Sequence, residues 1–133
     1  MSMSNASETN FLNLLFNNAD WANVGDAAGL QNSATAGSFY VALHTADPGD
    51  AGTQSTSEAS YTGYARVAVA RTAGGWTVSG NQVSNTATVQ FGECTAGSAV
   101  VTHFSVGLLS AGAGDILYSG ALDATRSVSS EIT

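Results

Sequence analysis

The residues best suited to chemistry stand together in FYVALHTADPGDAG, residues 39–52. His44 is followed by Asp47 and Asp50, and an imidazole with two carboxylates could bind zinc or iron. Such a site needs about three or four ligands on a stiff frame. Here both aspartates lie on a predicted turn, and the other histidine, His103, is far along the chain. We therefore interpret His44 as a strand end and the DPGD segment as a turn, and we expect no metal.

Nucleophilic catalysis is the second chemistry that the composition allows, because serine, histidine and aspartate all occur. Serine is so abundant that one near a histidine means little, and no G-x-S-x-G elbow is present. The acids are spread out, so no carboxylate pair indicates a glycosidase. GAGDIL, from Gly112, lacks the third glycine of a dinucleotide fingerprint. We expect no enzyme activity, no catalytic residue and no cofactor.

The charges exclude two classes of partner. The chain of 133 residues has three cations, all arginines, against ten acids, for a formal net charge of -7. Nucleic-acid binding depends on Lys and Arg contacts to phosphates, and so does attraction to an anionic membrane. We therefore expect neither partner. Arg66 and Arg71 flank an apolar strand, and we expect them to pair with neighbouring acids or backbone carbonyls; the alternative is that one anchors a partner's carboxylate.

Cys94 is the single cysteine, so no disulfide can form within this chain. A lone cysteine also cannot make a cysteine-type zinc site. We interpret it as a small buried hydrophobe in a strand.

The N-terminal region predicts a flexible arm followed by one helix. Residues 1–10 are small and polar, and residues 8–18 carry a helical pattern with Ser7 or Asn5 as the cap. Phe11, Leu14 and Leu15 share a face of this helix. The Gly-, Asn- and Ala-rich residues 19–37 predict a loop.

Beyond residue 38 the hydrophobic period becomes that of β-strands. The strict alternation of YARVAVAR predicts a half-buried strand over residues 64–71. Further strands are predicted at residues 38–44, 76–78, 82–91, 98–107, 116–122 and 125–132. Close spacing with Gly, Ser and Asn turns favours antiparallel pairing and leaves no room for crossover helices. We predict a mainly β fold, an antiparallel, jelly-roll-like β-sandwich with one N-terminal helix and long Gly/Ala/Ser loops, forming a single domain over residues 11–133.

Several long segments together resemble a family of tailed-bacteriophage virion proteins. The main one is GDAAGLQNSATAGSFYVALHTADPGDAGTQSTSEASYTGYARVAVAR, residues 25–71, and GGWTVSGNQVSN, VTHFSVG and GAGDILYSGAL extend it to Leu122. Members are often labelled tail-fibre-like, and those seen in virions look like β-sandwich decoration, or cement, proteins on the outside of the capsid. The family has no known catalytic residues, so none is transferred.

This resemblance implies a structural protein of the virion, made in the host cytoplasm and bound to the outer capsid surface. Its partners would be the major capsid protein and further copies of itself, as a dimer or trimer, and it would stabilise the shell by many-copy contacts. The alternative is a tail or tail-fibre component, with its aromatic residues contacting a host-surface glycan. The expected interface residues are Phe11, Leu14, Leu15, Trp21, Tyr61, Tyr64 and Arg66, although the helix could instead pack on its own core.

Overall fold

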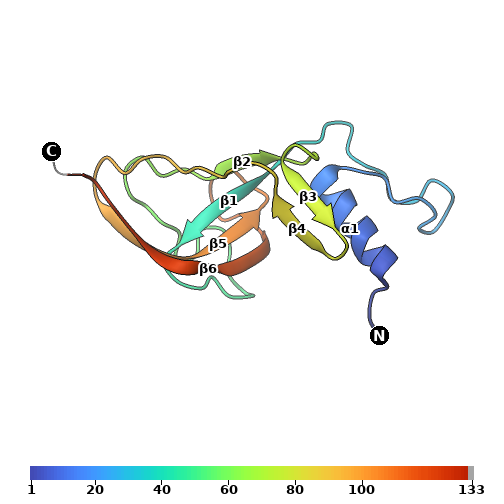
Figure 1. Cartoon of the computed structure of the whole chain (residues 1–133), viewed down its shortest axis with the longest axis horizontal. Helices are drawn as coiled ribbons and strands as arrows, with labels where there is room; N and C mark the ends of the chain where they lie inside the picture. Colours follow the sequence, from blue (N-terminus) through green and yellow to red (C-terminus); the bar gives the residue numbers. More distant parts are fainter. Residues whose placement is uncertain (132–133) are drawn as a thin grey trace. The chain divides into compact units, whose positions relative to one another are not determined.

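The computed structural model describes residues 1–131 and contains one helix and six strands (Figure 1). The elements are α1 (Asn5–Asn17), β1 (Ser38–His44), β2 (Val67–Ala70), β3 (Trp76–Ser79), β4 (Gln82–Asn85), β5 (Ser98–Gly107) and β6 (Ile116–Ser129). The predicted fold class, mainly β with antiparallel sheets and a short N-terminal helix, is confirmed. This strand layout is compatible with the predicted sandwich.

The strands form two sheets. One has four strands in the order β2-β1-β5-β6, and the other is the β3-β4 hairpin. β1 with β5, β5 with β6, and β3 with β4 all pair antiparallel. The hairpin turn uses Gly80, whose φ of 62° lies in the left-handed region that glycine adopts without strain.

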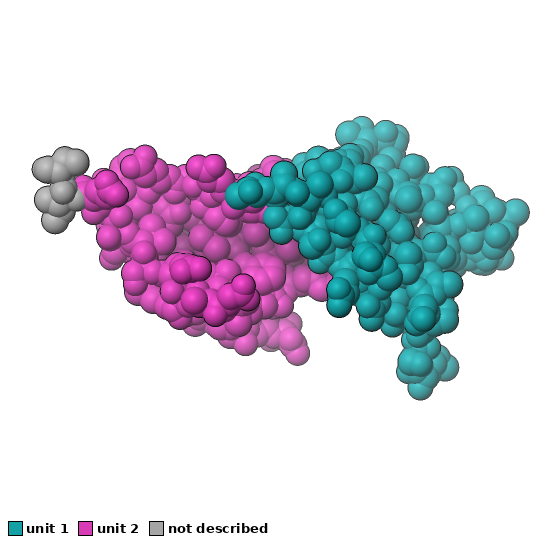
Figure 2. Space-filling view, viewed as in Figure 1, with its two compact units in different colours: residues 1–38, 69–88 teal, residues 39–68, 89–133 magenta. Residues whose placement is uncertain are grey.

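The chain divides into two compact units, coloured separately in Figure 2. We call residues 1–38 and 69–88 the helical unit, and residues 39–68 with 89–131 the sheet unit. The single domain predicted over residues 11–133 stays a prediction, and its last two residues lie outside the described part of the chain.

The helix differs from its predicted bounds at the N-terminal end. α1 begins at Asn5, three residues before the predicted start, because Ser4 is the N-cap and its hydroxyl accepts from Ser7 N–H at 3.3 Å. Residues 5–10 of the predicted flexible arm are therefore helical. At the other end, Asn18 is left-handed with φ 51°. The Arg71 guanidinium donates to the carbonyls of Leu14 and Leu15, so this arginine neutralises the negative end of the helix dipole.

The core of the helical unit forms between α1 and β3. Leu12, Phe16 and Trp76 are buried, and the rings of Phe16 and Trp76 meet edge to face with centroids 5.0 Å apart. The helix therefore packs within its own unit through Leu12 and Phe16, whereas the predicted face is exposed at Phe11 and half-buried at Leu14 and Leu15. Within residues 1–131, no helix is long and apolar enough to cross a membrane.

Strand ends show where local pattern was not enough. β1 and β5 have the predicted bounds, but the strand predicted over residues 64–71 is restricted to Val67–Ala70. Its first residues are taken by a turn in which Tyr64 N–H donates to Tyr61 O at 3.0 Å. The strand predicted over residues 82–91 ends at Asn85, whose side-chain amide donates to Ala87 O at 2.6 Å.

The two strands predicted near the C-terminus are one long strand. β6 runs from Ile116 to Ser129, because the chain between the two predicted segments stays extended beside β5. The predicted end at Ile132 lies outside the described residues.

The sheet unit is built around β1 and β5. Its buried hydrophobic residues are Phe39, Val41, Ala42, Ala59, Tyr61, Cys94, Val101 and Val106. Cys94 is buried, as predicted, but it lies in the loop before β5 and not in a strand.

Candidate interaction site

The structure gathers three of the seven predicted interface residues in the sheet unit. Tyr61, Tyr64 and Arg66 line a shallow hollow of about 390 Å³, together with Glu58 and residues 110–112 of the β5–β6 loop. Whether these residues contact another protein stays a prediction. Their contacts within the chain are described first.

Arg66 is the centre of this site. Its Nε and Nη2 donate to the two carboxylate oxygens of Glu58 at 2.7 and 2.8 Å, which is a bidentate ion pair. Nη1 and Nη2 also donate to the carbonyls of Leu109 and Gly112 at 2.9 and 2.7 Å. The Arg66 side chain is only 2% exposed. The predicted pairing with an acid and backbone carbonyls is confirmed, and Arg71 does the same with the helix carbonyls.

Two tyrosines hold Glu58 and the base of the hollow. The Tyr64 hydroxyl donates to Glu58 at 2.9 Å and accepts from Leu43 N–H at 3.0 Å. Its ring stacks on Phe91 and meets Tyr61 edge to face, with centroids 6.0 and 5.5 Å away. The Tyr61 hydroxyl donates to the backbone carbonyl of Gly92, in the loop before β5, at 3.0 Å. Both hydroxyls therefore have partners within the chain.

These contacts set the charge states of the site. Burial raises the pKa of Glu58. The hydrogen bonds from Arg66 and Tyr64 and the charge of Arg66 together lower this pKa by more than burial raises it, so it lies below its ordinary value. The hydrogen bond to Glu58 raises the pKa of Arg66, and burial raises the pKa of Tyr64 well above its ordinary value. The site therefore holds a neutralised ion pair and a neutral phenol, which suits binding by contact rather than proton transfer.

Gln54 fixes the loop that borders the hollow. Its side chain is fully buried. The side-chain amide makes the two hydrogen bonds that a paired strand would make to Leu109: Leu109 N–H donates to Oε1 at 2.9 Å, and Nε2 donates to Leu109 O at 3.2 Å. Gly107 and Gly114 lie so close to Gln54 that a Cβ on either would overlap its side-chain amide. Gln54 and Arg66 thus hold the backbone of residues 107–114 in one position.

This fixed loop presents two leucines to solvent. Leu108 and Leu109 are 42% and 49% exposed, although the backbone of Leu109 is bonded on both sides. Because the backbone of this loop is already fixed, binding a partner here would cost little loop-ordering entropy.

Comparison with known proteins places this chain. Residues 2–131 match the family described as Podophage GP4 fiber I protein gp80. The chain belongs to this family. No curated protein matches the sequence. The expected bacteriophage structural protein is therefore confirmed, while the capsid surface as its location is not part of the family description.

In this gp80-family chain, His44 ends β1, as predicted, and its side chain is buried in the core. Its Nδ1 donates to Thr56 O at 2.8 Å, and Ser105 Oγ lies 2.7 Å from Nε2. His44 and Ser105 have no exposed surface. The pair has the spacing of a serine–histidine dyad, but a backbone carbonyl occupies the place of the orienting carboxylate and no substrate can reach the serine. It joins β1 to β5 and to the loop before Glu58.

The two aspartates after His44 behave as the turn reading predicts. Asp47 Oδ1 accepts from Gly49 N–H at 2.9 Å, which closes a turn around Pro48, and Asp50 is exposed. Among residues 1–131, no three His, Cys, Asp or Glu side chains are grouped closely enough to hold a metal ion.

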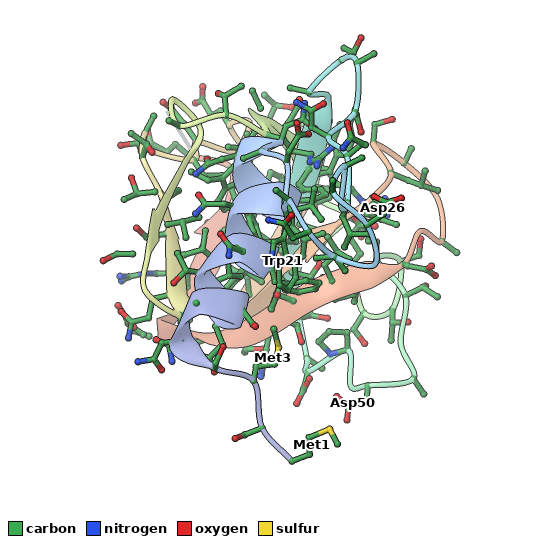
Figure 3. The ribbon with its side chains drawn as sticks, turned by 90° about the vertical axis from the view of Figure 1, so that its right-hand side faces the viewer. Met1, Met3, Trp21, Asp26 and Asp50 are labelled. Carbon is green, nitrogen blue, oxygen red and sulfur yellow. The ribbon has the colours of Figure 1, made fainter. Side chains whose placement is uncertain are left out.

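The other four predicted interface residues of this family member lie in the helical unit. Phe11 is 39% exposed, whereas Leu14 and Leu15 are half-buried on α1. Trp21 is half-buried and forms an antiparallel bridge with Leu30, with both hydrogen bonds at 2.9 Å. Figure 3 labels Trp21, which follows α1, and Met3, which precedes it and is 48% exposed. The seven predicted residues are therefore divided between the two units, and their role in an interface stays a prediction.

Sequence reasoning missed Gln54 and Glu58. Both lie in the polar linker AGTQSTSEASYTG, where nothing in the local pattern distinguishes them from solvated loop residues. The available signal was indirect: an arginine in a chain with three cations needs an acid, and Glu58 is the nearest acid in sequence to Arg66.

Proposed function

We propose that this chain is a non-enzymatic structural component of a bacteriophage fibre and acts by protein–protein contact. The family match over residues 2–131 carries this proposal, because its description names a fibre protein of a podophage. The attachment surface is the leucine loop, which we define as residues 108–112, together with the hollow beside it.

The character of the leucine loop supports attachment by contact. Leu108 and Leu109 supply apolar anchors, and Ser110 to Gly112 form one wall of the hollow. The two charges that line the hollow, Glu58 and Arg66, neutralise each other, so a partner covering the hollow desolvates a paired ion and not a single charge. A surface of this kind favours a lasting structural contact over a catalytic encounter.

Capsid decoration is the second candidate. The resemblance to outer-capsid β-sandwich proteins favours it, and so does the low charge, because 10% charged residues leave broad surfaces that can lie against the major capsid protein. In that case the same leucine loop would contact the shell, and stripping the protein would make particles less resistant to heat. A glycan-binding role for Tyr61 and Tyr64 is weakened, because both hydroxyls have partners in the chain.

The decisive experiment counts and locates the protein in purified virions. Quantitative mass spectrometry, with antibody labelling seen by electron microscopy, should find tens of copies at the fibres. Hundreds of copies spread over the head would instead support capsid decoration. A protein absent from complete particles would sink both candidates.

A variant then tests the surface. Replacing Leu108 and Leu109 by aspartate should abolish incorporation into virions while the purified protein keeps its melting temperature, because both side chains are largely exposed. The matched control is Val24→Asp with Ala22→Asp, on the exposed loop after α1 in the other unit, which should be incorporated normally.

A further inference from the structure

β6 is an edge strand with the features of an unfinished sheet. It lies at the end of the order β2-β1-β5-β6, drawn in red in Figure 1, and β5 is its strand neighbour within residues 1–131. It has 14 residues, about 45 Å of extended chain, whereas the opposite edge strand, β2, has four. A long edge presents a row of outward N–H and C=O groups that can pair with another strand.

β6 has one of the usual protections of an edge strand, a bulge between Ala121 and Arg126, but it lacks others. Its sequence, ILYSGALDATRSVS, has no proline or lysine, which commonly block pairing at an edge. Its two charged residues are Asp123 and Arg126, and they have opposite signs.

Arg126 differs from the other two cations. Arg66 is paired with Glu58, and Arg71 caps α1. Within residues 1–131, the side chains of Arg126 and Asp123 form no hydrogen bond or ion pair, and both residues are exposed. Ala121 and Arg126 have β5 partners two residues apart, so both lie on the same face of the sheet, and Asp123 falls in the irregular segment between them.

We propose that β6 pairs with β6 of a second copy, antiparallel about a twofold axis between Ala124 and Thr125. In this register Asp123 of each copy lies directly opposite Arg126 of the other. Residues directly opposite in an antiparallel pair share a face, and the twofold axis is perpendicular to the sheet, so the dimer gains two ion pairs on the same face of the joined sheets. The interface is self-complementary, as a twofold dimer requires.

The backbone of β6 fits this register. Residues 121 and 126 are five apart along β6, while their partners on β5, residues 103 and 101, are two apart, so β6 carries three extra residues here. In a regular β6, the residues whose backbone N–H and C=O point away from β5 would be all odd-numbered or all even-numbered. An odd number of extra residues switches this set from one to the other along the strand. An outward residue before the bulge therefore comes opposite an outward residue after it. If Ala121 points outward it meets Val128, and if Gly120 points outward it meets Ser129. A regular strand would place outward residues opposite inward ones in this register.

The test measures self-association of the purified full chain by sedimentation velocity across a range of concentrations. A dimer is expected, and Arg126→Glu should raise its dissociation constant about tenfold, because both ion pairs become like-charge contacts. Asp123→Arg should do the same. The exchanged variant, D123R with R126D, should restore dimerisation.

The control and the contrary outcomes are defined on the same protein. Asp26→Arg makes the same charge change as Asp123→Arg but lies on the exposed loop after α1 in the other unit, and it should not weaken the dimer by repulsion. A monomer at every concentration, a trimer, or a dimer indifferent to both charge reversals would overturn the proposal. Because the assay uses purified protein, its failure is separate from failure to find the chain in virions.

Discussion

Arg66 and Glu58 form a two-pronged ion pair, 2.7 Å from Nε to Oε1 and 2.8 Å from Nη2 to Oε2, and the same guanidinium binds the carbonyls of Leu109 and Gly112. One side chain thus joins the polar linker before β2 to the loop after β5. The candidate interaction site depends on this link.

Arg66→Ala should lower the free energy of unfolding by about 3 kcal/mol, because it leaves the half-buried Glu58 carboxylate and two carbonyls without their donor. Arg66→Lys keeps the charge but not the planar fork, and its loss should be intermediate. Urea unfolding at neutral pH measures both. Equal stability of the wild type and the alanine variant would contradict the importance of the pair.

Acid should weaken the protein through Glu58. Its folded pKa lies below the ordinary value of 4.5, so the stabilisation is fully present above about pH 4.5 and is lost as the pH falls through the folded pKa. Glu58→Gln, which cannot ionise, should be less stable at neutral pH but should lose less stability on acidification. Thermal unfolding between pH 7 and pH 3 compares the two slopes. Equal dependence of the melting temperature on pH in the wild type and the variant would show that the pKa of Glu58 is the same in the folded and unfolded states.

Gln54→Ala should loosen the leucine loop more than the sheet. It removes both hydrogen bonds to Leu109 and leaves a void beside Gly107 and Gly114, so we expect a loss of about 2–3 kcal/mol. Hydrogen exchange should show a faster Leu109 amide, with β1 amides changed only by the global loss of stability. An unchanged Leu109 amide would mean that the loop is held by Arg66 alone.

Phe16→Ala and Phe11→Ala should separate the two faces of α1. Phe16 is 1% exposed against Trp76, so its truncation should cost about 3–5 kcal/mol. Phe11 is 39% exposed, and its truncation should cost about 0.5 kcal/mol. Thermal unfolding measures both. A large cost at Phe11 would show that its exposed ring contributes to a contact in solution.

Local pattern predicted the bounds of β1 and β5, the two strands that pair at the centre of the four-stranded sheet. Residues 38–44 and 98–107 alternate between faces and have their predicted strand bounds, and the turn chemistry of the segment after His44 was also correct. The same rule failed at residues 64–66, where alternation continues but the side chains of Tyr64 and Arg66 bind Glu58 and the backbone turns. A period reports which face is apolar; it does not report which polar groups must be satisfied.

The sequence alone determined the fold class and the pairing of Arg66 and Arg71 with an acid or with backbone carbonyls. It did so because composition and period are properties of the chain itself. Only the tertiary structure decided that His44 meets Ser105 across 61 positions, that Gln54 holds the leucine loop across 55, and that β6 forms a bulged open edge. These contacts join segments that are far apart in the sequence. Polar linkers have no hydrophobic periodicity from which such contacts could be predicted.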